Sequence, residues 1–398
     1  MNIAPDHFVQ PLNRSPFINR FEALSRTENW ATWNSYKVAR VVDEIANEYF
    51  AVRSACAVMD LTPMEKYRIS GPDARAFLDR LVVRDLSKLR TGRVTYVAWC
   101  NDEGHVIDDG TLFQLGENDY RLCSQHHQLD WLHISAQGFD VAIEHETHQV
   151  AALAVQGPTS FSVLRDAGAA ELDELKPFGF VKSRIAGQPV LISRTGYTGD
   201  LGYELWLDPA AADAVWDAVF AQTPHYAVSA MGLDALEMVR LEAGFVMPGF
   251  DFVAADVAIR SNRARTPTEA GLGWLVSFDK GHFTGRAALL AEKSETPRRR
   301  LVKLTVEGNR PVCDSFIHAR RGGPRVGEIR AATWSPMLKT NVALAEINLV
   351  RGDLPANLWA RVDYQRELAW HSIWARCHPQ IKAAVTPAHR SLTPPQRY

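Results

Sequence analysis

"ALAVQGPTSFSVLRDAG", residues 152–168, joins a run of small apolar residues to a Gly-Pro pair and then to residues with helical spacing. The run predicts a strand, and the glycine lets the chain turn sharply toward a helix. Proline suits the first helical turn, because its missing N–H would have no partner there. A second stretch, "KYRISGPDARAFLDRL" (66–81), has the same order. The two units predict an internally duplicated α+β domain.

The sequence around these units extends the same plan. Strand-rich sequence follows each unit, at 94–124 and at 179–207, and residues 208–222 and 229–244 have the pattern of amphipathic helices. A polar linker at 292–300 then precedes sequence typical of an all-β module. We therefore expect two related α+β units followed by a separate β module.

The composition is that of a globular protein with two or three domains: 398 residues, 46% hydrophobic and 23% charged. A net charge of −2 argues against nucleic acid as the main partner. The sequence has neither a signal-peptide pattern nor an apolar run long enough for a membrane span. Five cysteines without a CxxC pair favour a reducing cytoplasm.

Possible metal ligands gather in "CSQHHQLDWLH": Cys123, His126, His127 and His133. A zinc site needs about four convergent ligands, and no second cluster in the sequence completes this one. A solvated helix start is the better interpretation, so we expect no metal.

Aromatic residues gather near the N-terminus, where Trp30, Trp33 and Tyr36 fall at helical spacing within 28–53. A stripe of this kind favours core packing over a substrate wall.

"NDEGHVIDDGTLF" (101–113) places two adjacent carboxylates, Asp108 and Asp109, in a predicted hairpin of strands 93–100 and 105–115. Aspartate is a poor strand former, and a buried carboxylate is costly unless it is paired or hydrogen-bonded. The pair therefore needs an explanation.

Strand alternation puts Asp108 on the face of Val106, and Asp109 on the face of Ile107. The two carboxylates then point in opposite directions, and at most one enters a pocket. Spacing alone does not say which.

A third acid lies in "SRTGYTGDLGYELWL" (193–207), a tight glycine turn between two predicted strands. Glu204 shares a strand face with Trp206, opposite Tyr203. A carboxylate accepts two hydrogen bonds in a fork, so it could recognise a planar ring with adjacent N–H donors. A surface glutamate is the alternative, and spacing alone favours it.

Seven stretches between about residues 45 and 380 resemble, in order, the glycine-cleavage T-protein (aminomethyltransferase) superfamily: "YFAVRSACAVMDLTPMEKYRISGPDA", "GHVIDDGTLF", "ALAVQGP", "SRTGYTGDLGYELWL", "VRLEAG", "FTGRAAL" and "ATWSPML…NVALAEI". The resemblance implies a disc-like, duplicated α+β folate-binding unit with a C-terminal β-barrel. The chain would divide into an N-terminal helical segment, two α+β folate-binding units, the barrel and a disordered tail, at 1–60, 61–145, 146–292, 300–385 and 386–398.

The resemblance also implies roles for three residues. Asp108 matches the family's catalytic aspartate beside N5 and N10 of tetrahydrofolate. Glu204 matches the acid that holds the edge of the pterin ring, and Tyr96 matches a tyrosine that lines the folate. A carboxylate near N5 and N10 can steer protonation and stabilise a developing cation.

Departures from the family concern the side facing the one-carbon donor. Leu236 replaces a folate-site arginine, and Pro248 replaces an aromatic residue. "WATWNSY" stands near the place of a missing early motif, whereas Arg240 and Glu242 match the family and are interpreted as a structural pair.

These features predict an enzyme, a tetrahydrofolate-dependent one-carbon transferase that moves a methyl or aminomethyl group from a small donor. An orthodox glycine-cleavage aminomethyltransferase, working with a lipoyl carrier protein, is one alternative. A non-catalytic folate-binding factor for iron–sulfur proteins is another, although "KGHFTGRAA" (280–288) lacks that branch's cysteine. A flavoprotein partner that supplies an imine is also possible.

Overall fold

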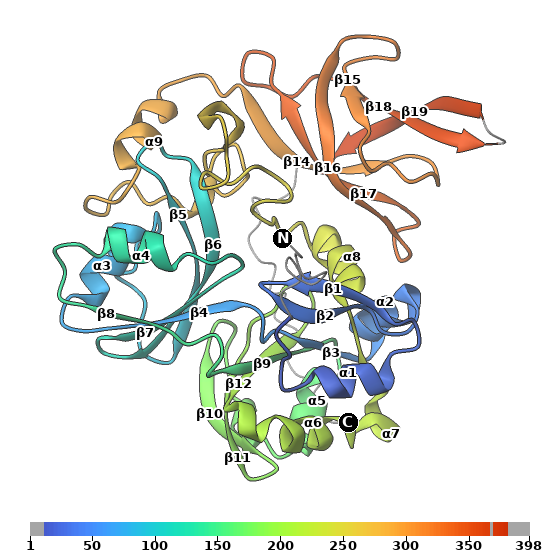
Figure 1. Cartoon of the computed structure of the whole chain (residues 1–398). Coiled ribbons are helices and arrows are strands. Elements are labelled where there is room, and N and C mark those ends of the chain that lie inside the picture. The colour runs from blue at the N-terminus through green and yellow to red at the C-terminus, as the bar shows by residue number, and fades with distance from the viewer. Residues whose placement is uncertain (1–11, 367–368, 381–398) are drawn as a thin grey trace, which may run out of the picture.

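The computed structural model describes residues 12–366 and 369–380, which build two open sheets and a closed barrel (Figure 1). The first sheet has the strand order β5-β6-β7-β4-β8 and is antiparallel throughout. Its strands are β4 (Glu65–Ser70), β5 (Arg93–Cys100), β6 (Val106–Gly116), β7 (Asp119–Ser124) and β8 (Ala142–His145). Two helices accompany it, α3 (Ala74–Leu81) and α4 (Leu129–Ser135).

The second sheet has the order β10-β11-β12-β9-β3-β13, and its β3–β13 pair is parallel. Its strands are β3 (Cys56–Asp60), β9 (Ala151–Gln156), β10 (Phe180–Ile185), β11 (Gln188–Ser193), β12 (Gly202–Leu207) and β13 (Val228–Ala230). The accompanying helices are α5 (Ser160–Asp166), α6 (Ala212–Phe220), α7 (Thr223–Tyr226) and α8 (Leu233–Ala243), with 3-10 turns at Ala170–Leu172 and Pro209–Ala211. The helix expected at 229–244 thus begins later, because the first residues of that range pair with β3.

The duplicated unit predicted from the sequence is present in both sheets. Strand β4 leads through Gly71 into α3, and β9 leads through Gly157 into α5. Both glycines have φ of 126°, a backbone conformation that residues with a side chain rarely adopt. A Cβ would lie 2.6 Å from the Asp140 carbonyl oxygen at the first and 2.5 Å from the Ala55 carbonyl oxygen at the second. Each turn therefore requires glycine, and the predicted α+β class is confirmed.

The N-terminal part differs from the expected helical segment. It contains α1 (Ile18–Leu24) and α2 (Ile45–Ser54), but a hairpin of β1 (Asn29–Trp33) and β2 (Tyr36–Val41) separates them. The helix that the spacing of Trp30, Trp33 and Tyr36 indicated is therefore wrong, since these residues lie in a β-hairpin. The physical reason is the turn: Asn34 and Ser35 have φ of 45° and 63°, as in the tight turns that suit hairpins.

A closed barrel forms the C-terminal part, as the resemblance predicted, with the order β14-β17-β16-β15-β18-β19. Its strands are β14 (Arg299–Val306), β15 (Phe316–His318), β16 (Arg325–Ser335), β17 (Thr340–Asn348), β18 (Leu358–Arg366) and β19 (Ala369–Pro379). The segment between α8 and the barrel contains α9 (Arg286–Lys293) and 3-10 turns at Ser261–Arg263 and Gly273–Leu275. The predicted disordered tail, 386–398, lies outside the described residues.

Helix α8 connects these parts. It packs against β16 and β17 of the barrel on one side and against α2 and β2 on another (Figure 1). No helix in the described ranges is long and apolar enough to cross a membrane.

Candidate functional site

A cavity of about 420 Å³ lies between the two sheets and α8. Strands β6 and β7 of the first sheet, β9 and β12 of the second, and the β1–β2 hairpin all contribute to its wall. Its volume is in the range of roughly 300–1,000 Å³ that is usual for small-molecule sites. The duplicated architecture therefore places a ligand-sized space at the centre of the molecule.

Asp109 is the member of the acid pair that lines this cavity. The Tyr96 hydroxyl donates a hydrogen bond to its carboxylate, and Tyr96, also in the wall, stacks on Trp274 at 6.1 Å between ring centroids. Burial, and then the nearby charge of Asp108, raise the pKa of Asp109 to about 8. Asp109 is thus positioned to exchange a proton near neutral pH.

Asp108 is fully buried and is not among the residues that line the cavity. Its carboxylate accepts the backbone N–H of Asp109 at 2.9 Å and that of His126 at 3.1 Å. The His126 ring nitrogen Nδ1 lies 3.6 Å from the same carboxylate, and His126 belongs to the loop between β7 and α4. The opposed directions of the two acids are confirmed, but Asp108, the expected catalytic residue, faces this loop and Asp109 faces the cavity.

A bulge explains the part of the alternation that was wrong. Strand β6 pairs Asp108 with Trp99 but Val106 with Cys100, so the register shifts at Ile107. Ile107 consequently packs in the core on the Asp108 side, and Val106 packs in a different core cluster. Strict alternation had placed Val106 on the face of Asp108 and Ile107 on the face of Asp109, and the bulge exchanges the two.

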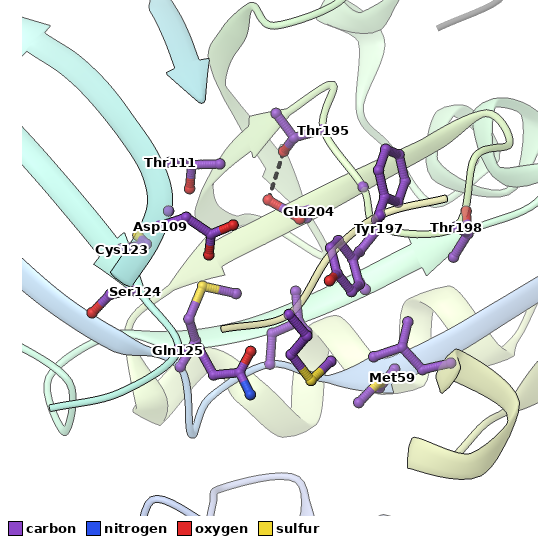
Figure 2. Close-up of a pocket in the computed structure, with 18 of the residues that line it drawn as sticks. Met59, Asp109, Thr111, Cys123, Ser124, Gln125, Thr195, Tyr197, Thr198 and Glu204 are labelled. Carbon is purple, nitrogen blue, oxygen red and sulfur yellow. Dashed lines mark hydrogen bonds between the residues drawn. The ribbon is translucent and has the colours of Figure 1, made fainter. Parts of the chain in front are cut away.

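Glu204 lies in β12 and lines the cavity from the second sheet. The Thr195 hydroxyl donates to its carboxylate at 2.5 Å, and burial raises its pKa to about 7. Figure 2 shows the side chains of Asp109 and Glu204 reaching into the same space from different strands. With 8% of its surface exposed, Glu204 is not the surface residue that spacing alone favoured.

The glycines of the 193–207 stretch allow close packing around Gln156. A Cβ at Gly196 or Gly202 would lie 2.1 or 2.0 Å from the Gln156 side-chain oxygen. The Gln156 amide donates to the carbonyl oxygens of Thr195 at 3.3 Å and of Tyr203 at 3.0 Å. This buried amide therefore holds the loop that carries the hydrogen-bond partner of Glu204.

Apolar side chains from α8 and from the β1–β2 hairpin form one part of the cavity wall. Leu236 lines the cavity at the position where the family has an arginine, and Trp33 reaches it from the hairpin. Trp33 is therefore part of the cavity wall, against the expected preference for core packing. Pro248 is not among the lining residues, although its neighbour Met247 is.

The expected structural pair of Arg240 and Glu242 does not form. Residues two apart on a helix point to different sides, so each finds other partners. Arg240 pairs with Glu237 at 2.6 Å and with Asp251 at 2.5 Å, and Glu242 pairs with Arg53 at 2.6 Å.

Acidic side chains supply all the formal charge of the described cavity wall: Asp109, Glu204, Asp234 and Glu237. Asp234 pairs with Arg40 and Glu237 with Arg240. In the described part of the chain, the remaining two acids have no lysine or arginine partner. The acids therefore favour, in the part of a ligand that they contact, a neutral or cationic group rich in N–H donors.

The GCVT N-terminal domain family matches residues 22–280. The chain belongs to the GCVT family. This match spans both open sheets and the cavity wall between them, and the resemblance found in the sequence is confirmed.

Relatives within the GCVT family have two kinds of name. The aminomethyltransferase of Bacillus subtilis is 33% identical over 344 residues, which cover 85% of this chain and 91% of that protein. The trimethylamine-oxide aldolase of Ruegeria pomeroyi is 34% identical over 366 residues, covering 88% of this chain but only 45% of that protein. The structure of glycine cleavage aminomethyltransferase T from Bartonella henselae has the same fold, with a TM-score of 0.77, 24% identity and coverage of 92% and 97%.

As a GCVT-family member, the protein is a folate-dependent one-carbon transferase, and the predicted enzyme class is confirmed. The non-catalytic alternative is not favoured by these relatives. Sequence reasoning missed Asp109, Thr195 and Tyr197 as cavity residues, although the last two lie inside the family-like stretch 193–207. It also missed Gln125, for which the sequence holds no signal, because only the fold brings that loop to the cavity.

Proposed function

We propose that the cavity binds tetrahydrofolate between the two sheets, with Glu204 at the pterin ring and Asp109 beside N5 and N10. Two buried acids lie across one ligand-sized cavity, without lysine or arginine partners among the residues that the structure describes, and this observation carries the proposal. Ionised Glu204 would accept hydrogen bonds from the pterin amino group and the adjacent ring N–H. Tyr96 would orient the carboxylate of Asp109.

The role first assigned to Asp108 passes in this proposal to Asp109. Asp109 borders the space that a folate would occupy, whereas Asp108 holds the backbone of the loop at His126. In a methyl transfer, the N5 lone pair forms the bond to the methyl carbon while the bond to the donor heteroatom breaks and leaves its electron pair there. Asp109, when ionised, accepts the proton that N5 then loses.

For the donor, we propose a small methylated molecule, neutral or positively charged at the reacting heteroatom. The cavity wall combines Leu236 and Trp33 with acidic residues and lacks basic side chains among the described residues. The relative from Ruegeria pomeroyi is named for trimethylamine oxide, which is a small methylated compound. The orthodox alternative is an aminomethyl group on a lipoyl carrier protein, and an imine from a flavoprotein is a third source. The free thiols suit a cytoplasmic setting.

Titration with tetrahydrofolate tests the binding site. We expect saturable binding in the wild type and affinity weaker by about 2–3 kcal/mol in Glu204→Gln, because the amide loses the charge-assisted fork. The pKa of Glu204 is about 7, and the ionised form accepts the bonds, so wild-type binding should tighten as pH rises through that value. Equal affinities in the two proteins would remove Glu204 from the site.

Separation of the folate products tests the donor. With a methylated small donor we expect 5-methyl-tetrahydrofolate, and with aminomethyl-lipoyl carrier protein we expect little turnover. Efficient release of ammonia and 5,10-methylene-tetrahydrofolate from the lipoyl carrier would overturn the donor proposal and restore the orthodox aminomethyltransferase.

A further inference from the structure

We propose that Glu65, His127 and His145 form a binding site for a divalent transition-metal ion, with Zn²⁺ as the best match. The three side chains come from β4, from the loop between β7 and α4, and from β8. None of them lines the central cavity. The histidine-rich stretch of the sequence supplies one ligand, and the fold adds two residues distant in the chain.

The geometry of the three ligand atoms supports this site. His145 Nε2 lies 2.6 Å and His127 Nδ1 lies 3.4 Å from the same carboxylate oxygen of Glu65. All three atoms lie within 4.8 Å of one another. A tetrahedral Zn²⁺ with bonds of about 2.1 Å keeps its ligands about 3.4 Å apart. An ion therefore fits once the His145 ring moves slightly away from the Glu65 carboxylate.

Neighbouring side chains hold the ligands in place. The Thr147 hydroxyl donates to Glu65 at 3.1 Å, and the Tyr67 ring stacks on His145 with 5.4 Å between centroids. Such outer contacts orient metal ligands in known sites. The Glu65 side chain is 7% exposed, whereas that of His127 is 52% exposed. The site is thus anchored on one side and open on the other, where an ion could enter and retain a water.

A simple ion pair does not account for the arrangement. Two imidazoles converge on one carboxylate oxygen, and Glu65 forms no lysine or arginine salt bridge within the described ranges. Two histidines and one carboxylate are a donor set that suits zinc and other first-row transition metals.

The site includes part of the loop between β7 and α4, which also contacts Asp108. Gln125 lines the cavity, the backbone N–H of His126 donates to Asp108, and His127 is the next residue. A metal on His127 would fix this loop against β4 and β8. The ion therefore acts through position and takes no part in the transfer.

The experiment uses the 398-residue protein after treatment with a chelator. Titration with Zn²⁺ should show one ion per chain, and Co²⁺ should give the visible absorption bands of a four-coordinate site. Glu65→Gln and His127→Ala should weaken Zn²⁺ binding by at least about 100-fold, since loss of a ligand exceeds loss of an outer contact. His133→Ala is the matched control, because His133 is exposed and outside the group, and should bind as the wild type does.

Thermal unfolding gives the second readout. Saturating Zn²⁺ should raise the Tm of the wild type and of His133→Ala, but not that of His127→Ala. Because His127 is half exposed, its truncation should leave the fold intact, and this variant decides the matter if Glu65→Gln does not fold. Absence of saturable binding in the wild type, or undiminished binding in His127→Ala, overturns the site.

Discussion

The adjacent acids Asp108 and Asp109 show how strongly surroundings separate two identical side chains. Asp108 accepts two backbone N–H groups and lies beside His126, so its carboxylate serves the loop. Asp109 has the Tyr96 hydroxyl as its side-chain partner and borders open space. Burial raises the pKa of both acids, and Asp108 further raises that of its neighbour. A general base needs a pKa near the working pH, which Asp109 has.

We expect Asp109→Asn to lower kcat by about 10²–10⁴-fold with folate binding retained, because only the proton acceptor is lost. Asp108→Asn should reduce thermal stability more than kcat. In the wild type, kcat/KM should rise with pH through about 8, where Asp109 ionises, and this step should vanish in Asp109→Asn. Steady-state kinetics across pH provides the measurement. A larger rate loss in Asp108→Asn would return the catalytic role to Asp108.

The raised pKa of Asp109 also predicts how the stability of the protein depends on pH. The folded-state pKa of Asp109 exceeds its ordinary value of 3.8, so the folded protein binds more protons than the unfolded chain between those values. The free energy of unfolding should therefore fall as pH rises from about 4 to 8. Denaturant titrations should show a smaller fall in Asp109→Asn.

At the scale of elements, the repeated strand-glycine-helix turn sets the position of both sheets. Gly71 and Gly157 share the same φ, and the backbone carbonyl of another segment closes over each. The proline after each glycine suits the first turn of the helix that follows. Short-range chemistry therefore specifies the turn, and close packing makes it intolerant of a side chain.

We expect Gly157→Ala to lower the free energy of unfolding by about 2–4 kcal/mol, because the methyl group meets the Ala55 carbonyl oxygen and the backbone conformation is strained. Gly187→Ala is the control: Gly187 also has a positive φ, of 75°, but a Cβ there meets nothing within 4 Å. It should cost about 1 kcal/mol. Similar losses in chemical denaturation would show that backbone conformation, and not the close approach, dominates.

For the whole molecule, a largely buried ion pair ties the barrel to the part of the chain that carries the cavity. The Arg265 guanidinium donates to both carboxylate oxygens of Glu346 in β17, at 2.7 and 2.8 Å. The Arg265 carbonyl oxygen accepts the backbone N–H of Val106, in the strand that carries Asp109. One residue thus joins the barrel to the strand at the cavity wall.

We expect Glu346→Gln to destabilise the protein by about 3 kcal/mol, because it leaves Arg265 buried without a full negative partner. The matched control is Asp363→Asn, which breaks the exposed barrel pair with Arg361 and should change stability by less than about 1 kcal/mol. Differential scanning calorimetry measures both. If the two variants unfold alike, the Arg265 pair contributes no more than a surface pair.

Local chemistry in the sequence determined the repeat, the β5–β6 hairpin and the strand of Glu204. Glycine, proline and alternating apolar residues act within a few residues of one another, so their pattern predicts local structure without the rest of the chain. The class of enzyme could also be predicted from the sequence, because each family motif is a short continuous stretch and the motifs occur in the order of the family.

Only the tertiary structure decided which acid borders the cavity. A one-residue bulge in β6 shifts which neighbours share a face, and the bulge depends on pairing with β5. The sequence likewise did not predict the hairpin of Trp33. The spacing of its aromatic residues indicated a helix, and the turn conformation at Asn34 and Ser35 makes the segment a hairpin. The meeting of Glu65, His127 and His145 joins residues up to 80 positions apart. Such contacts arise from packing between strands, which no local pattern records.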